Sequence, residues 1–245
     1  MNKEKIILTA HQPVYLPWLG LFHKISLADI FVYFDDVQYQ TKDWNNRNKI
    51  KTNQGDIWLT VPVLNKDHYQ LKLKDVMINN ELPWARKHFK SIYLTHKKAK
   101  YFDKYIGFFE DTYNKKWDKL SDLNEHLLKN IMKFLGIEVK FFKLSEYGFT
   151  SSKSELVLEM CQKMGADLYI FGIQGKNYAD LEAFKKAGIN VYFQDYQHPV
   201  YDQLHGKEFS PFLSIIDLLF NHGEDSLRIV QSGNITKGEL LKSIV

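Results

Sequence analysis

A histidine opens an unusual loop near the start of the chain. His11 follows an apolar run and begins a stretch, residues 11–20, that holds two prolines, two aromatic rings and a glycine. An imidazole titrates near neutral pH, so His11 is a candidate general acid, general base or donor to a developing oxyanion. The alternative is a histidine that only holds the loop by a local hydrogen bond. Pro13 and Pro17 each remove an amide donor and restrict the preceding residue, which favours a stiff loop suited to a site.

Two carboxylates end the next apolar run, residues 30–34. Alternation along a strand directs Asp35 and Asp36 to opposite sides, so one of them can face the same site as His11. That side chain would orient His11, bind an amine or hydroxyl group of a substrate, or hold a divalent cation; the alternative is a cap on a strand-end turn. We predict His11, Asp35 and Asp36 as the catalytic candidates.

Aromatic, cationic, amide and glycine residues supply the candidate substrate contacts. Trp18 and Trp44 offer flat walls for a sugar or base, while Lys24, Arg47 and Lys176 suit phosphates. The alternatives are a solvent-facing Lys24 and an Arg47 engaged in hairpin packing and a salt bridge. The full predicted set is Gln12, Pro13, Tyr15, Trp18, Gly20, Lys24, Trp44, Asn46, Arg47, Gly172, Gly175, Lys176, Tyr178 and Gln203.

The turn at residues 172–178 carries two glycines and a lysine. It is too short for the phosphate loop GxxxxGK[ST] and lacks the GxGxxG spacing, so it supports anion or sugar binding only weakly. The sequence has no Cys/His spacing typical of zinc and no GxSxG elbow, and we predict no metal site.

These residues must be positioned by a sheet, because each cluster follows an expected strand. Strands are predicted at residues 5–10, 30–34, 139–144, 168–171 and 191–194, and most alternate with helices, predicted at 18–28, 154–164, 179–187 and 211–220. Such alternation indicates an α/β fold with a mostly parallel, Rossmann-like sheet. Ligands of such sheets bind outside the carboxyl ends of the strands, where the clusters would meet.

Two excursions interrupt this pattern. Alternating runs around a glycine-containing turn predict a β-hairpin at residues 46–63, and apolar stripes predict a helical lobe at about 83–136. We treat both as parts of a single α/β domain spanning residues 1–245.

Composition limits the class of protein and its partners. The chain has 245 residues, 44% of them hydrophobic, and a single cysteine, so a disulfide within the chain is excluded and a reducing cytoplasm is expected. No stretch approaches membrane-spanning length, so no membrane insertion is expected. Residues 86–119 hold ten Lys/Arg against four Asp/Glu, which suits a phosphate-rich partner such as tRNA, although a solvated helical face explains it as well.

Several motifs together resemble a bacterial family. The pattern His11-Gln-Pro-x-Tyr-Leu-Pro-Trp-x-Gly20-x-x-x-Lys24 is similar to the opening of the WbqC-like family, and further motifs extend the resemblance over nearly the whole chain. These are Ala28-Asp-x-Phe-Val, Asp36-Val-Gln-Tyr39, Asn46-Arg47, Trp58-Leu-Thr-Val-Pro62, Tyr169-x-x-Gly172-x-x-Gly-x-x-Tyr178, Tyr201-x-Gln203 and Phe212-Leu-Ser-Ile-Ile-Asp-Leu-Leu-Phe-Asn-x-Gly223.

The resemblance implies a place in the synthesis of O-antigen and other surface polysaccharides. From it we expect a transferase that moves an acyl or aminoacyl group, from a donor that the sequence does not identify, to a nucleotide-linked amino sugar. No cofactor is expected to be required. The strand, histidine loop and helix are also similar to the opening of HxGH nucleotidylyltransferases, but Pro-Trp-Leu-Gly stands where their second histidine belongs. A binder of RNA or phosphate without catalytic activity is the other alternative.

Overall fold

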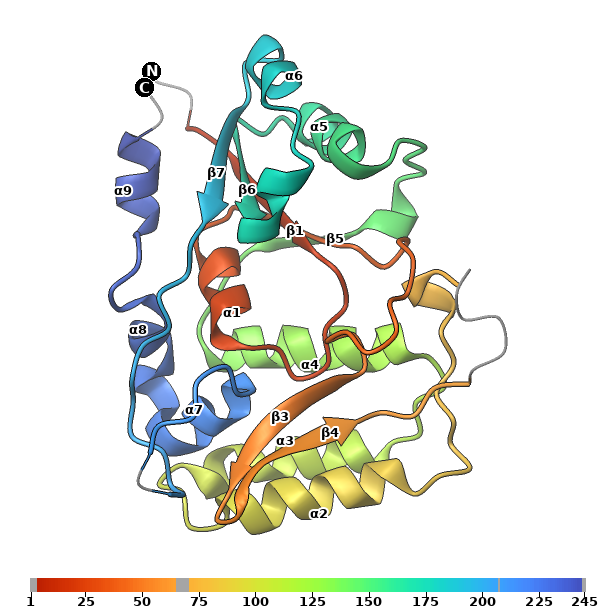
Figure 1. The fold of residues 1–245 in the computed structure, drawn as a ribbon, viewed down its shortest axis with the longest axis vertical. Coiled ribbons are helices and arrows are strands. Elements are labelled where there is room, and N and C mark those ends of the chain that lie inside the picture. The colour runs from red at the N-terminus through yellow and green to blue at the C-terminus, as the bar shows by residue number, and fades with distance from the viewer. Residues whose placement is uncertain (1–3, 65–70, 207, 244–245) are drawn as a thin grey trace.

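A five-stranded sheet forms the centre of the protein. The computed structural model describes residues 4–64, 71–206 and 208–243 (Figure 1). The strands of the sheet are β1 (Ile7–His11), β2 (Ile30–Tyr33), β5 (Lys140–Lys143), β6 (Leu168–Gly172) and β7 (Asn190–Gln194). Their order is β5-β2-β1-β6-β7, and every neighbouring pair is parallel. The prediction of an α/β fold with a mostly parallel sheet is confirmed.

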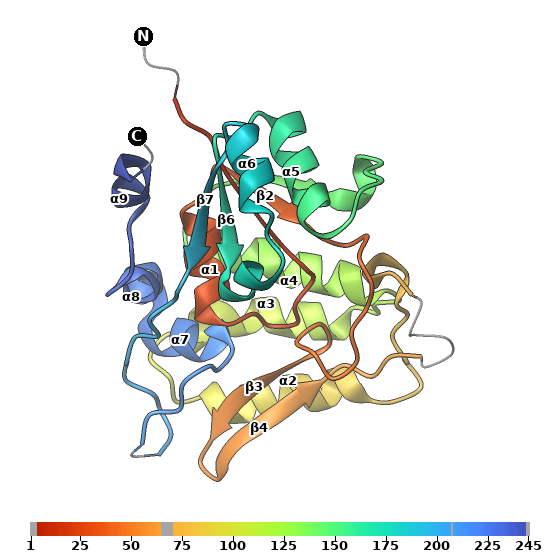
Figure 2. The same ribbon diagram turned by 45° about the horizontal axis from the view of Figure 1, so that its top comes forward.

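A separate antiparallel hairpin carries part of the candidate site. It consists of β3 (Arg47–Thr52) and β4 (Gly55–Thr60), and Lys49 lies opposite Trp58 in its register. The turn requires a glycine because φ is +110° at Gly55. Figures 1 and 2 both place the hairpin beside α2 (Trp84–His96), and β3 also contacts α7 (Ile215–His222).

Helices cover both faces of the sheet and build the predicted lobe. The lobe consists of α2 with α3 (Phe102–Asn114) and α4 (Leu120–Phe134). The remaining helices are α1 (Leu19–Ser26), α5 (Lys153–Met164), α6 (Leu181–Lys186), α8 (Ser226–Gln231) and α9 (Lys237–Lys242). Short 3-10 helices lie at Leu73–Asp75, Leu144–Glu146, Ile173–Asn177 and Gly223–Asp225.

Strand alternation divides the core between the two faces of the sheet. Phe31 and Tyr33 of β2 face α1, the hairpin and the lobe, where the largest apolar cluster lies. Ile30 and Val32 face the opposite side and pack against α5 and α6. Both side-chain sets of β2 are buried, as expected for a parallel strand with helices on each face.

The predicted helix at 211–220 was wrong at its start. The structure begins α7 at Ile215, with Ser214 as its N-cap. Phe212 has φ +60°, a left-handed conformation that a right-handed helix excludes, so Pro211 does not open the helix. The turn at residues 172–178 forms a 3-10 helix, Ile173–Asn177, where no element was predicted.

No helix within the described part of the chain is long and apolar enough to span a bilayer.

Candidate active site

The loop that follows β1 is held rigidly by the hairpin region. Asn45 donates from Nδ2 to the Pro13 carbonyl at 2.8 Å, and Asn48 donates from Nδ2 to the Leu16 carbonyl at 2.5 Å. Leu16 has φ +47°, an unfavourable conformation for a residue with a branched side chain. Surrounding contacts must enforce such a conformation, and the loop therefore has the stiffness that a preorganised site needs.

His11 lies at the carboxyl end of β1, where the sheet topology places a site. Its Nδ1 lies 2.9 Å from the Gln12 carbonyl, which can only accept a hydrogen bond, so Nδ1 carries the proton and Nε2 carries a lone pair. Burial and the nearby Lys24 ammonium lower the pKa of His11 to about 3. The ring is therefore neutral at physiological pH and can accept a proton at Nε2.

Lys24 is buried beneath the same end of β1. Its side chain is 4% exposed, and Nζ donates to the Ala10 carbonyl at 2.9 Å. Among the described residues no carboxylate forms an ion pair with it. Burial lowers its pKa to about 7. A solvent-facing Lys24 is thus excluded, and a bound anion would supply the counter-charge that this ammonium lacks.

A row of rings runs from His11 to the surface of the hairpin. His11 contacts Trp18 edge to face at 5.4 Å between ring centroids, Trp18 lies 5.9 Å from Trp44, and Trp44 lies 5.4 Å from Trp58. We call these four residues the aromatic row. Trp58 is 44% exposed although it is a large apolar side chain, so the row ends at a ring that is open to solvent.

Cations lie directly over the open end of the aromatic row. The Arg47 guanidinium is 4.6 Å and the Lys49 Nζ is 5.2 Å from the Trp58 ring centroid. Strand alternation puts Arg47, Lys49 and Lys51 on one face of β3. Arg47 also donates to the Lys42 carbonyl, but within the described residues neither Arg47 nor Lys49 pairs with a carboxylate. Both remain available to an anionic ligand.

Asp35 is engaged away from His11. Its carboxylate is 2% exposed and accepts hydrogen bonds from the Ser145 hydroxyl at 2.6 Å and the Ser145 amide at 3.0 Å. These bonds tie the end of β2 to the segment after β5. Asp35 is thus a buried anchor. One of Asp35 and Asp36 was expected to face His11, but His11 Nδ1 donates to the Gln12 carbonyl instead.

Asp36 forms ion pairs at the surface. Lys72 lies 2.8 Å and Lys74 lies 2.6 Å from its carboxylate oxygens. Hydrogen bonds and charges from these lysines outweigh partial burial and lower the pKa of Asp36. The carboxylate is therefore ionised at neutral pH, with both cations supplied by the chain itself.

Sequence comparison with known proteins agrees with the motif pattern. The model of the WbqC-like protein family matches residues 12–229. The chain belongs to the WbqC-like family. An uncharacterized protein of Mycobacterium tuberculosis, Rv1507c, is similar to it, with 35% identity over 228 residues that cover 92% of this chain and 96% of the relative. No solved structure gives a significant match. Family membership suggests a role in surface-polysaccharide biosynthesis.

Two of the predicted glycines in this WbqC-like protein are close to rings. A Cβ on Gly20 would lie 2.9 Å from the Tyr196 ring, and a Cβ on Gly175 would lie 2.6 Å from Phe171. Packing therefore explains the absence of a side chain at both positions. Gly172 ends β6 and has open space around it.

Other predicted residues of the WbqC-like chain lie apart from the aromatic row. Tyr15 is fully buried, and its hydroxyl bonds to His88 Nδ1 at 2.7 Å and to Tyr113. Asn46 donates to the Val61 carbonyl within the hairpin region. The rest are Lys176, exposed with Nζ 5.9 Å from the Phe193 ring; Tyr178, half exposed against Phe171; and Gln203, bonded to Lys51. Gln12 and Pro13 lie in the rigid loop itself.

The predicted set of site residues did not include Trp58, Lys49, Asn45 and Asn48, which the structure places in the aromatic row, over it, or against the loop after β1. A signal for the first two existed, because strand alternation in a hairpin predicts Arg47 and Lys49 on one face. The position of the turn fixes which residues of the hairpin lie opposite each other. A turn at residues 53–54 places Trp58 opposite Lys49. The two asparagines gave no such signal, because their partners are backbone carbonyls more than 30 residues away.

The described residues hold neither a cluster of metal-ligating side chains nor an exposed thiol. No group of three or more His, Cys, Asp or Glu side chains there is arranged to hold a metal ion. Cys161 is buried, and burial raises the pKa of its thiol to about 12. Its thiol therefore stays protonated and shielded from substrates.

Proposed function

We propose that this WbqC-like protein transfers an acyl or aminoacyl group to the amino group of a nucleotide-linked amino sugar. The observation that carries the proposal is the half-exposed Trp58 beneath Arg47 and Lys49, at the open end of the aromatic row. A nucleotide sugar combines flat rings with a diphosphate, and adjacent tryptophans beside cations without a carboxylate partner match both parts.

His11 would serve as the proton acceptor at the inner end of the row. The substrate amine attacks the acyl carbonyl carbon, a C–N bond forms, and the bond to the donor's leaving group breaks. The proton released by the amine passes to His11 Nε2 and then to the leaving group. His11 is a weak base in the free protein because Lys24 and burial disfavour its charged form. An anionic group of the bound donor beside Lys24 would offset the Lys24 charge and raise the pKa of His11 from its value in the free protein.

The donor would bind at the basic face formed by residues 86–119. All ten Lys and Arg side chains of residues 86–119 are exposed, on α2, α3 and the adjoining turns. This basic face suits the phosphates of an aminoacyl-tRNA donor. Binding of tRNA that falls steeply as salt rises, and that weakens when Lys87 and Lys90 are replaced by Gln, would support this part; salt-insensitive binding would contradict it.

Nucleotidyl transfer of the HxGH type receives no support from the second histidine of the chain. His23 is 1% exposed, and both ring nitrogens are engaged: Nδ1 accepts from Gln194 at 2.8 Å, and Nε2 donates to the Ile235 carbonyl at 3.0 Å. A histidine in that state is not free to donate to a phosphoryl group.

Ligand binding and turnover test the proposal separately. A thermal-shift and calorimetry panel of nucleotide sugars, the parent nucleotides and the free sugars should give a response only when ring and diphosphate are both present. Trp58→Ala should weaken that binding, whereas Tyr93→Ala, a matched exposed ring on α2, should not. His11→Ala should retain binding and lose turnover at an almost unchanged Tm. Equal binding by wild type and Trp58→Ala would refute the site.

A further inference from the structure

One glycine at the carboxyl end of the sheet is not required by the fold. Gly172 is the last residue of β6, and its φ of −71° and ψ of 169° are values that any residue adopts. A Cβ added to Gly172 would meet no atom within 4 Å. A glycine in a strand weakens it, because glycine loses more conformational freedom on folding than other residues. Neither the backbone conformation nor the packing of the chain explains this cost.

The other glycines of the chain differ from Gly172 in conformation, packing or position. Most have a positive φ, and Gly20 and Gly175 lie too close to aromatic rings to carry a Cβ. Gly107 and Gly238 share the open space of Gly172, but both lie on exposed surfaces of helices, in α3 and α9. Gly172 is partly buried and has a paired strand on each side.

The register of the sheet places Gly172 beside His11. β1 and β6 are parallel neighbours, and the last pair between them is Thr9 with Ile170. His11 and Gly172 each lie two residues further, so alternation puts both on the face that α1 covers. Gln194, opposite Gly172 on β7, agrees with this face, because its side chain donates to a backbone carbonyl of α1 at 2.9 Å. Neighbouring strands lie about 4.8 Å apart, so the open space at Gly172 is one strand spacing from His11.

The order of the strands also points to the ends of β1 and β6. From β1 the chain passes through α1 to β2, and from β6 it passes through α6 to β7, in the opposite direction along the sheet. α1 and α6 cover opposite faces. Ligands of open parallel sheets bind where connections diverge in this way, outside the carboxyl ends of the two strands. His11 and Gly172 flank that point.

We propose that Gly172 contacts the sugar of the nucleotide-linked amino sugar and limits which sugars can bind. The inference rests on the proposed function, which puts the flat ring and the diphosphate at the open end of the aromatic row and the amine at His11. The sugar joins these two parts of the substrate. It therefore lies beside His11 and extends over the neighbouring strand, where Gly172 leaves space and lets the ligand approach the backbone.

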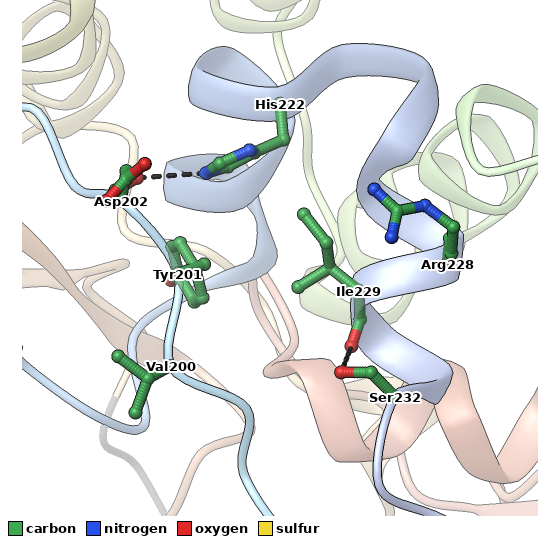
Figure 3. A pocket seen from close by; sticks show the side chains of 7 residues that line it. All are labelled: Val200, Tyr201, Asp202, His222, Arg228, Ile229 and Ser232. Atoms are coloured by element: carbon green, nitrogen blue, oxygen red, sulfur yellow. Dashed lines mark hydrogen bonds between the residues drawn. The ribbon is translucent and has the colours of Figure 1, made fainter.

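A surface depression elsewhere is a rival place for a nucleotide sugar. It has a volume of about 410 Å³ and lies between the loop after β7 and α8 (Figure 3). Tyr201 and Asp202 line one side of it, and His222, Arg228 and Ile229 line the other. Its lining includes no residue of the aromatic row and none from the ends of β1 and β6. Binding of an anionic ligand there would depend on the Arg228 guanidinium and not on residue 172.

Calorimetry with paired ligands tests the inference without an activity assay. The probes are UDP-glucosamine, dTDP-glucosamine and the parent diphosphates UDP and dTDP. Gly172→Ala should weaken binding of the nucleotide sugar that binds wild type best by roughly 10-fold or more, because the added methyl group occupies space that the sugar needs. Gly172→Val should weaken it further. Both variants should bind the parent diphosphate as wild type does, because the diphosphate lies at the other end of the aromatic row.

Two controls separate loss of the sugar contact from damage to the fold. The Tm of Gly172→Ala should equal or exceed that of wild type, because the position accepts a side chain and alanine loses less conformational freedom on folding. Gly238→Ala, at the open and exposed position on α9, should leave the binding of every probe unchanged. Arg228→Gln should also leave it unchanged.

The outcomes distinguish failure of the sugar contact from failure of the proposed function. Equal nucleotide-sugar binding by wild type and both Gly172 variants, a lower Tm for Gly172→Ala, or an equal loss for sugar-linked and parent diphosphates would overturn the role of Gly172. Nucleotide binding that still depends on Trp58 would then leave the proposed function standing. If wild type binds none of the four probes, or binds them through Arg228 instead of Trp58, the proposed function and the role of Gly172 both fail.

Discussion

The Lys24 ammonium donates its hydrogen bond to Ala10, the residue directly before His11, at 2.9 Å. A buried cation is thus attached to the backbone that carries the candidate base, with no acidic side chain paired to it among the described residues. Burial of a cation without an acidic partner destabilises the free protein. The same charge attracts an anionic ligand that binds beside it.

Lys24→Met should stabilise the free protein and weaken its binding of phosphates. The pKa of Lys24 falls from 10.5 to about 7 on folding. Burial of the charged lysine therefore destabilises the folded protein fully below pH 7, and this cost disappears as pH rises toward 10.5. After the loss of the Ala10 hydrogen bond is deducted, the gain at pH 7 should be about 2–4 kcal/mol. Urea unfolding at pH 7 and pH 10 measures it. Lys90→Met, at an exposed position of α2, is the control, and a gain that did not shrink at pH 10 would contradict the explanation.

Asn48→Ala should loosen the loop that presents His11. The variant leaves the Leu16 carbonyl without its donor at a strained position, and the expected loss is about 1–3 kcal/mol of unfolding free energy. Nucleotide-sugar affinity should fall with it, because Trp18 follows that loop. Denaturant titration and calorimetry provide the two measurements. Asn53→Ala, in the exposed hairpin turn, should change neither.

Asp35→Asn and Asp36→Asn should differ sharply in stability. Asp35 accepts two hydrogen bonds in a buried setting, so its replacement should cost about 2–4 kcal/mol. The Asp36 ion pairs lie at the surface and should contribute about 0–1 kcal/mol. Thermal unfolding compares the variants directly. A stable Asp35→Asn protein without turnover would restore Asp35 as a catalytic residue.

Asp217→Asn should raise stability at neutral pH but not in acid. Folding raises the pKa of Asp217 from 3.8 to about 6, so its ionised form is penalised above pH 6, and the penalty vanishes below 3.8. The variant should gain about 3 kcal/mol at pH 7.5 relative to wild type and almost nothing at pH 4. A loss of stability at pH 7.5 would show that the charge is compensated in the folded protein.

Much of the fold could be predicted because its signals are local. The continuous apolar run of β2 predicts a buried strand. The apolar residues of α2, α3 and α4 recur at helical spacing, so these elements can be recognised from neighbouring residues alone. The start of α7 could not be predicted, because a proline near residue 211 usually opens a helix and nothing in the sequence shows the left-handed φ of Phe212. In the structure the Phe212 amide donates to His198 Nε2 at 3.2 Å, a contact between segments that the sequence does not show.

The candidate site could be predicted only in part. Sheet topology correctly placed His11 at a strand end, and the prolines indicated a rigid loop. The partners of individual side chains were beyond reach: Asp35 faces Ser145, which is 110 residues away, and Lys24 turns inward to Ala10 rather than toward solvent. Long-range pairing of this kind depends on how elements pack, and a single sequence contains no measure of it.

The place of β1 in the sheet has a consequence for synthesis on the ribosome. β1 pairs on one side with β2, about 20 residues later, and on the other with β6, where Leu8 lies opposite Tyr169. Until the chain has grown past β6, one edge of the central strand has no partner. β1 therefore gains its second strand partner only after more than half of the chain has been synthesised, which makes the pairing of β1 with β6 a late, long-range step of folding.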